Sequence, residues 1–157
     1  MAQKKKKTIV AVSGGFDPLH IGHIRLLNEA KKLGDTLVVI LNNDNWLLAK
    51  KGFVFMDEDD RKEILESLAA VDEVILTSHM ENDHDRSVCR ELLKLKPDIF
   101  ANGGDRTFAD AKKAASSLSP EVELCERMGI KLVFNVGKGG KVRSSTELVA
   151  RFKKGGK

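Results

Sequence analysis

The sequence GGFDPLHIGH, residues 14–23, separates a short apolar run from a stretch with helical periodicity. Residues 8–13 (TIVAVS) are rich in β-formers and stop abruptly at two glycines, which is typical of a buried strand followed by a tight loop. From Ile21 to Leu33 the apolar residues recur at helical spacing, and Gly34 offers a left-handed stop. The stretch therefore predicts a strand, a loop and a helix in succession, with the amides of the helix N-terminus placed to bind phosphate.

Strands and helices are expected to alternate along the rest of the chain. Further strands are expected at residues 36–41, 71–76, 98–101 and 131–136, and further helices after the acidic cluster 57–60, through residues 88–93, from residue 119 to Gly129 and at residues 148–152, with a polar loop at residues 42–56. Such alternation predicts a single doubly wound, Rossmann-like α/β fold with a parallel sheet of about five strands and helices on both faces. The ligand site of such a sheet lies at the carboxyl ends of its strands.

The length of 157 residues fits one domain, expected to span residues 1–157. The lysines at residues 4–7 and at 153, 154 and 157 place the excess of 27 basic over 23 acidic residues at the two ends, so residues 1–7 and 153–157 are expected to be flexible tails. Few aromatic residues and no tyrosine argue against nucleic-acid binding. No apolar stretch approaches a membrane span, so a cytoplasmic protein with no membrane partner is expected. Cys89 and Cys125 lack a metal or disulfide spacing and are expected to be packed thiols.

Two histidines stand at the start of the first helix. His20 and His23 are three residues apart and therefore point the same way, and Gly22 between them lets a ligand approach the backbone closely. A zinc pair is one alternative, but a third ligand is missing nearby; two packed core histidines are another. His79 and His84 fall in a polar loop and are expected at the surface.

Phe16-Asp17 followed by His20-x-Gly22-His23 resembles the signature of the cytidylyltransferase-like nucleotidyltransferase superfamily. Further similar motifs follow in the same order: DRKEIL at 60–65 with VDEVI at 71–75, KPD at 96–98 with GGD at 103–105, and RSST at 143–146. The GGD segment and the length are most similar to heptose-phosphate adenylyltransferase domains, followed by glycerol-3-phosphate cytidylyltransferase and archaeal FAD synthetase. Gly15 and Pro18 depart from the commonest pattern, which leaves the nucleotide base and the acceptor undecided.

The resemblance implies transfer of a nucleoside monophosphate from ATP or CTP to a phosphorylated acceptor, with direct attack on the α-phosphorus and release of pyrophosphate. A sugar phosphate such as heptose 1-phosphate or a polyol phosphate is the first expectation, and FMN is the alternative. Mg²⁺ is expected to travel with the triphosphate, with no protein metal site except that Asp17 could contact the ion or orient the loop. A homodimer is implied by resemblance alone. A nucleotide-sensing module without turnover is the rival interpretation.

The same resemblance implies roles for individual residues. His20, His23, Lys50 and Arg143 are the expected catalytic groups, because preorganised donors and cations stabilise the charge that develops on phosphate. Residues expected to bind the nucleotide are Gly15, Phe16, Asp17, Gly22, Lys51, Gly104, Asp105, Ser144, Ser145 and Thr146. Arg61 could reach the acceptor or pair with the acids beside it. Trp46 could stack on a ring or pack against the protein.

Overall fold

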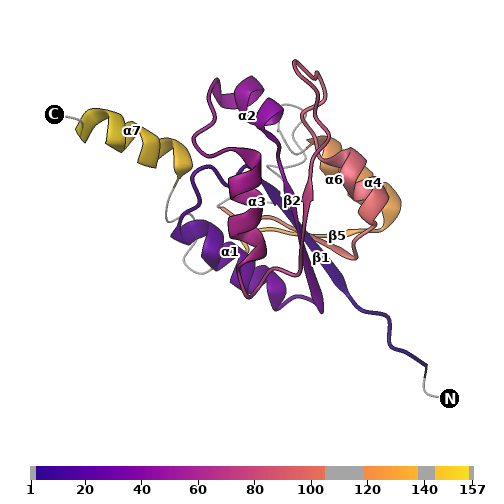
Figure 1. Ribbon diagram of the computed structural model, residues 1–157. Coiled ribbons are helices and arrows are strands. Elements are labelled where there is room, and N and C mark those ends of the chain that lie inside the picture. Colours follow the sequence, from indigo (N-terminus) through magenta and orange to yellow (C-terminus); the bar gives the residue numbers. More distant parts are fainter. Residues whose placement is uncertain (1–2, 105–118, 138–143, 156–157) are drawn as a thin grey trace.

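The computed structural model describes residues 3–104, 119–137 and 144–155. Its centre is a parallel sheet of five strands in the order β3-β2-β1-β4-β5, as expected from the sequence (Figure 1). The strands are β1 (Ile9–Gly14), β2 (Thr36–Leu41), β3 (Glu73–Leu76), β4 (Ile99–Ala101) and β5 (Lys131–Val133). The helices of the described residues are α1 (Ile21–Lys31), α2 (Asp44–Lys51), α3 (Glu58–Glu66), α4 (Cys89–Leu95), α6 (Ser119–Met128) and α7 (Ser145–Gly155).

The central strand β1 is covered on both faces. Val10 and Val12 belong to one core cluster, which also holds Leu27 of α1 and Leu65 of α3. Ala11, on the opposite face of the strand, belongs to a second cluster with residues of α4 and α6, including Leu92, Leu124 and Cys125. The near-continuous apolar strands of the sequence therefore reflect a sheet buried from two sides, as parallel sheets require. Cys125 is buried and Cys89 packs against the same cluster, so both are packed thiols, and burial raises the pKa of each.

The order of strands places a switch point between β1 and β4. β1 pairs with β2 on one side and with β4 on the other. The chain therefore adds β2 and β3 on one side of β1, and then adds β4 and β5 on its other side. Ligands of doubly wound sheets bind in the crevice at such a point, outside the carboxyl ends of the strands. The loop 14–20 and the first turn of α1 lie at this end of the sheet.

The expectation of a polar loop at residues 42–56 was wrong for residues 44–51, where the chain forms α2. The side chain of Asn43 caps this helix by accepting the backbone N–H of Trp46 at 3.0 Å, and Gly52 ends it at φ +79°. Of its residues only Leu47 is fully buried, so the sequence carries almost no apolar periodicity from which to recognise the helix.

The other boundaries differ by a few residues. β5 ends at Val133 rather than at residue 136, because the chain turns at Asn135, which has φ +56°. α7 continues to Gly155, so Lys153 and Lys154 lie on a helix rather than in the flexible tail expected at residues 153–157. No helix in the described parts of the chain is both long and apolar enough to span a membrane.

Candidate active site at the carboxyl end of the sheet

The two histidines cap the start of α1 together. Nδ1 of His20 accepts the backbone N–H of Gly22 at 3.1 Å, and Nδ1 of His23 accepts the backbone N–H of His20 at 3.3 Å. The two rings stack with their centroids 3.7 Å apart. A reciprocal pair of this kind satisfies two amides that a helix start otherwise leaves without partners.

These hydrogen bonds fix the tautomer of a neutral ring. A ring nitrogen that accepts an N–H carries no proton, so the proton of each neutral imidazole lies on Nε2, which is then a donor. Burial, together with the nearby charges of His20 and Lys51, lowers the pKa of His23 to about 3, so this ring is neutral at pH 7. The arrangement supplies a preorganised Nε2–H donor at the N-terminus of a helix, where the dipole already favours an anion.

Phe16 and Gly15 shape the loop before the histidines. Phe16 is buried at φ +50°, and its ring centroid lies 4.8 Å from that of His23. A Cβ at Gly15 would lie 2.9 Å from a methyl carbon of Leu47, so a larger residue would force the side chain of Leu47 to shift. Both residues therefore position the histidine loop by packing.

Asp17 is buried and ties this loop to the segment after α2. Its two carboxylate oxygens accept the backbone N–H groups of Phe55 and Met56, each at 2.7 Å. Of the two roles expected for Asp17, orientation of the loop is the one that these hydrogen bonds show directly. Within the described residues, His, Cys, Asp and Glu side chains form no cluster of three or more that could hold a metal ion.

Arg61 is a buried residue that links the histidine loop to the neighbouring segments. Its side chain is fully buried and donates to the backbone carbonyls of Met56 at 2.9 Å and of Gly15 and Asn42 at 2.7 Å each. It also pairs with the carboxylate of Asp44 at 2.7 Å. The partner acid is therefore on α2 rather than on the acidic turn beside Arg61. A planar, permanently charged fork can satisfy several carbonyls at once, which a lysine cannot.

The structure separates the two lysines at the end of α2. Nζ of Lys51 donates to the backbone carbonyl of Asp17 at 3.4 Å, and burial is the main cause of a lowered pKa of this half-buried lysine. The ammonium of Lys50 lies 4.7 Å from the ring centroid of Trp46. Lys51 is thus the lysine whose described contact is with the histidine loop.

A buried polar network, which the sequence interpretation missed, joins the ends of β2 and β3. The amide of Asn43 donates to the backbone carbonyls of Thr77 and His79, at 3.2 and 2.8 Å. The ring of His79 bonds to the hydroxyl of Thr77 through Nδ1 and to the carbonyl of Ser87 through Nε2. The expectation of a surface histidine was therefore wrong for His79, which is buried, and right for His84, which is exposed. The polar residues around His79 in the sequence are typical of an exposed loop and do not indicate that this loop buries the histidine.

The start of α7 meets the histidine loop. The hydroxyl of Ser145 donates to the backbone carbonyl of Pro18 at 2.9 Å, although the two residues are 127 positions apart in the chain. The hydroxyl of Ser144 accepts the backbone N–H of Glu147 at 3.4 Å, and Thr146 lies exposed in the first turn. The structure thus brings together the first and last motifs of the sequence, as a shared phosphate site requires.

The GGD segment is described only in part. Gly103 and Gly104 follow β4, and Gly104 has φ +80°, a conformation that favours glycine. Asp105 and Arg143 lie outside the described residues.

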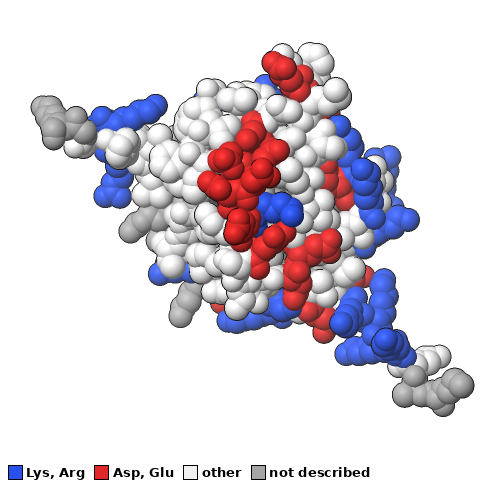
Figure 2. All heavy atoms as spheres, in the orientation of Figure 1, with Lys and Arg blue, Asp and Glu red and all other residues white. Residues whose placement is uncertain are grey.

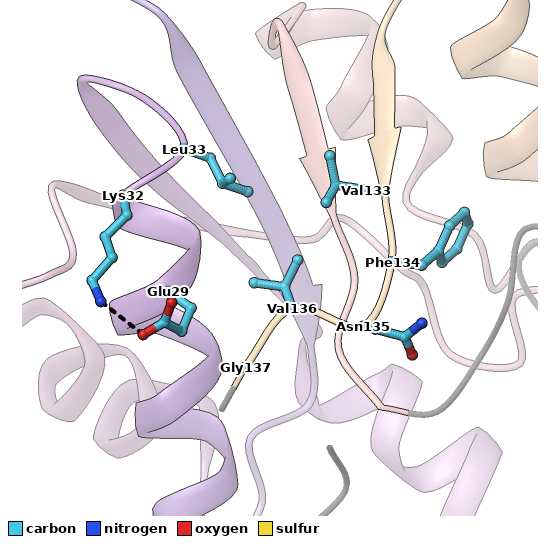
Figure 3. A pocket seen from close by; sticks show the side chains of 8 residues that line it. All are labelled: Glu29, Lys32, Leu33, Val133, Phe134, Asn135, Val136 and Gly137. Carbon is cyan, nitrogen blue, oxygen red and sulfur yellow. Dashed lines mark hydrogen bonds and ion pairs between the residues drawn. The ribbon is translucent and has the colours of Figure 1, made fainter. Parts of the chain in front are cut away.

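A cavity of about 520 Å³ lies elsewhere, beside the second half of α1 (Figure 3). It is lined by Glu29, Lys32, Leu33, Val133, Phe134, Asn135, Val136 and Gly137. None of these is an expected site residue. Figure 2 shows acidic side chains over α3 and basic side chains towards both ends of the chain.

Comparison with known proteins identifies the family. Residues 11–151 match the family model described as cytidylyltransferase-like. The protein belongs to this family. It is therefore a nucleotidyltransferase by family membership, and the enzyme class expected from the sequence is confirmed.

The relatives that the comparison found carry different names. The chain is 41% identical over 107 residues to an FAD synthase of Thermococcus sibiricus, covering 67% of this chain and 68% of that protein. It is 36% identical over 126 residues to the bifunctional protein HldE of a Nitratiruptor species, covering 78% of this chain but 25% of that protein. A solved structure of a lipopolysaccharide core biosynthesis protein from Thermoplasma volcanium is 32% identical, with a TM-score of 0.59, and the match covers 82% of this chain and 94% of that chain.

Proposed function

We propose that the protein transfers AMP from ATP to FMN, forming FAD and pyrophosphate. The observation that carries this proposal is the 41% identity to an FAD synthase, over more than two thirds of that protein's length. It favours FMN, the alternative acceptor expected from the sequence, over a sugar or polyol phosphate.

The reaction needs positioning and charge stabilisation more than acid–base chemistry. An oxygen of the FMN phosphate attacks the α-phosphorus of ATP, the bond from that phosphorus to the bridging oxygen of the β-phosphate breaks, and pyrophosphate leaves. A phosphate oxygen is already a competent nucleophile, so no general base is required.

The histidines are proposed to act on the α-phosphate. The Nε2–H groups of His20 and His23 would donate to its non-bridging oxygens, where negative charge develops in the transition state. Lys51, at the edge of the same loop, would add a positive charge for the α- or β-phosphate or for the phosphate of FMN.

The remaining phosphates are assigned to the start of α7. Its first amides and the side chains of Ser144, Ser145 and Thr146 would receive the β- and γ-phosphates, with Arg143 adding charge. Gly104 and Asp105 would help to place the nucleotide. Mg²⁺ would neutralise the triphosphate while keeping most of its waters, because the described residues offer no cluster of three or more protein ligands for it.

The test is direct. The purified protein is incubated with Mg²⁺ and either ATP or CTP, against FMN, heptose 1-phosphate and glycerol 3-phosphate separately, and both pyrophosphate and the new nucleotide product are measured. We expect FAD from ATP and FMN, lost in a His23→Ala variant. Product from a sugar phosphate but none from FMN would contradict the proposal.

Sugar-phosphate transfer is the second candidate, because the GGD segment and the length of the chain resemble heptose-phosphate adenylyltransferase domains. The acceptor panel separates the two directly. The homodimer expected by resemblance is a further prediction, which light scattering of the purified protein measures.

A further inference from the structure

The helix α2 and the segment that follows β3 form one wall beside the histidine loop. Besides the bonds of Asn43, the amide of Asn45 donates to the carbonyl of His79 at 3.0 Å, and the indole N–H of Trp46 donates to the carbonyl of Arg86 at 2.9 Å. In Figure 1 this helix and this segment lie at the same end of the molecule, where β2 and β3 end. The wall is therefore held by hydrogen bonds along its length.

Trp46 lies where this wall meets the loop that precedes the histidines. An atom of its six-membered ring is 3.5 Å from the position that a Cβ on Gly15 would occupy. The indole is half-buried and its N–H is already bonded, so its orientation is fixed before any ligand binds. Lys50, one helical turn on, places its ammonium 4.7 Å from the ring centroid, and this cation–π contact also helps to hold the ring in place.

The same helix also carries a lysine close to the histidine loop, where the phosphates are proposed to bind. Lys51 follows Trp46 by five residues, about 7.5 Å along the helix axis, and it reaches the carbonyl of Asp17 in the histidine loop. The helix α2 thus carries an aromatic ring, Trp46, near its start and a cation that could bind phosphate, Lys51, at its end. FMN has the matching pattern, with a flat isoalloxazine ring joined by a flexible chain to its phosphate.

We propose that Trp46 is a specificity-determining residue, on which the flat ring of the acceptor stacks while the acceptor phosphate lies near Lys51 and the histidines. The inference rests on the proposed FMN adenylyltransferase function and names the residue that selects the acceptor. Stacking rewards an aromatic ring and gives nothing to a sugar or polyol phosphate, so it favours FMN within a family that uses several acceptors.

The experiment measures the Kd for FMN by the quenching of flavin fluorescence, in wild type and in three variants of α2. Trp46→Leu removes the ring, and Trp46→Phe keeps a ring but removes the bond to the carbonyl of Arg86. Leu48→Ala, on the exposed side of the same helix, is the matched control. Binding of a non-hydrolysable ATP analogue and thermal unfolding are measured on each protein, so that loss of the fold is recognised.

We expect Trp46→Leu to raise the Kd for FMN by about 10- to 100-fold, the range for removing one stacking partner, with the affinity for the ATP analogue unchanged. Trp46→Phe should recover most of the affinity, and Leu48→Ala should bind FMN as wild type does. A Leu variant that binds the ATP analogue normally and FMN as tightly as wild type would overturn the inference and leave the proposed function standing.

A second readout needs no variant. The chain has one tryptophan, so protein labelled with fluorotryptophan gives a single fluorine resonance that reports Trp46 alone. FMN should shift this resonance through its ring current, and glycerol 3-phosphate should not. Saturating FMN without a shift refutes stacking, whereas a wild-type protein that neither binds FMN nor forms FAD refutes the proposed function together with the inference.

Discussion

The ring of His23 stacks on that of His20 at 3.7 Å between centroids, and each ring accepts a backbone N–H through Nδ1. Each histidine thereby helps to orient the other. A substitution at either position is expected to disturb both donors.

Replacing either histidine should reduce turnover sharply. For His20→Ala and His23→Ala we expect kcat to fall by about 10²- to 10³-fold, the usual cost of removing one preorganised donor to a developing negative charge. His20→Ala should also lower the free energy of unfolding by roughly 1 kcal/mol, because it removes the N-cap of α1. Rates under single-turnover conditions and urea unfolding measure the two effects. His84→Ala, at an exposed histidine, is the control and should change neither.

The free energy of unfolding should depend on pH through His23. Its pKa in the fold is about 3 against an ordinary 6.5, so the unfolded chain binds this proton at a pH where the folded chain does not. Stability is therefore fully present above pH 6.5 and is lost as the pH falls towards 3. Between pH 7 and pH 5 this loss should be about 2 kcal/mol.

Urea unfolding of wild type and His23→Asn at both pH values measures that difference. Other titrating groups act in both proteins and cancel, so the variant should lose less stability on acidification. Equal losses in the two proteins would show that the His23 ring is protonated in the fold above pH 5.

Removing Arg61 should damage stability and activity together. In Arg61→Met the carboxylate of Asp44 loses its partner and three backbone carbonyls lose their donor, which should lower the free energy of unfolding by about 3 kcal/mol. Arg61→Lys should rescue little, because one ammonium cannot span these carbonyls. Chemical denaturation provides the measurement. Lys62→Met, in an exposed pair with Glu66 on the same helix, should leave the midpoint almost unchanged.

The two lysines of α2 should differ in effect. We expect Lys51→Gln to reduce kcat/KM for ATP by about 10²-fold, because its ammonium lies at the histidine loop. Lys50→Gln should chiefly raise the KM for FMN, because its ammonium lies over Trp46. Steady-state kinetics with each substrate varied in turn measure both, and the same loss for ATP in the two variants would contradict the assignment.

The sequence predicted the fold well because its strands are apolar and its helices are bounded by glycine, proline and capping residues. It assigned the histidine loop and the last motif to phosphates of one nucleotide, and the bond between Ser145 and Pro18 shows that these two segments lie in contact. It missed α2, whose buried face is the single residue Leu47.

The roles of the buried polar residues could not be predicted from the sequence. Arg61 stands in an acidic turn, yet its partners are carbonyls brought in from three separate segments. His79 looks like a loop residue until Thr77 and Ser87 are placed around it. In both cases tertiary packing decides the hydrogen-bond partners, and the pattern of neighbouring residues in the sequence does not predict them.

The strand order also has a consequence for how the protein is made. The loop and its supports, from Asp17 to Arg61, lie within the part of the chain that builds the three adjacent strands β1, β2 and β3. They can assemble as soon as that part leaves the ribosome, since domains begin to fold during synthesis. Until Ile99–Ala101 emerges, however, β1 lacks its second neighbour, and its backbone N–H and C=O groups on that side form an open sheet edge. The arrival of β4 pairs this edge of β1, and β4 is in turn an edge strand until β5 pairs with it.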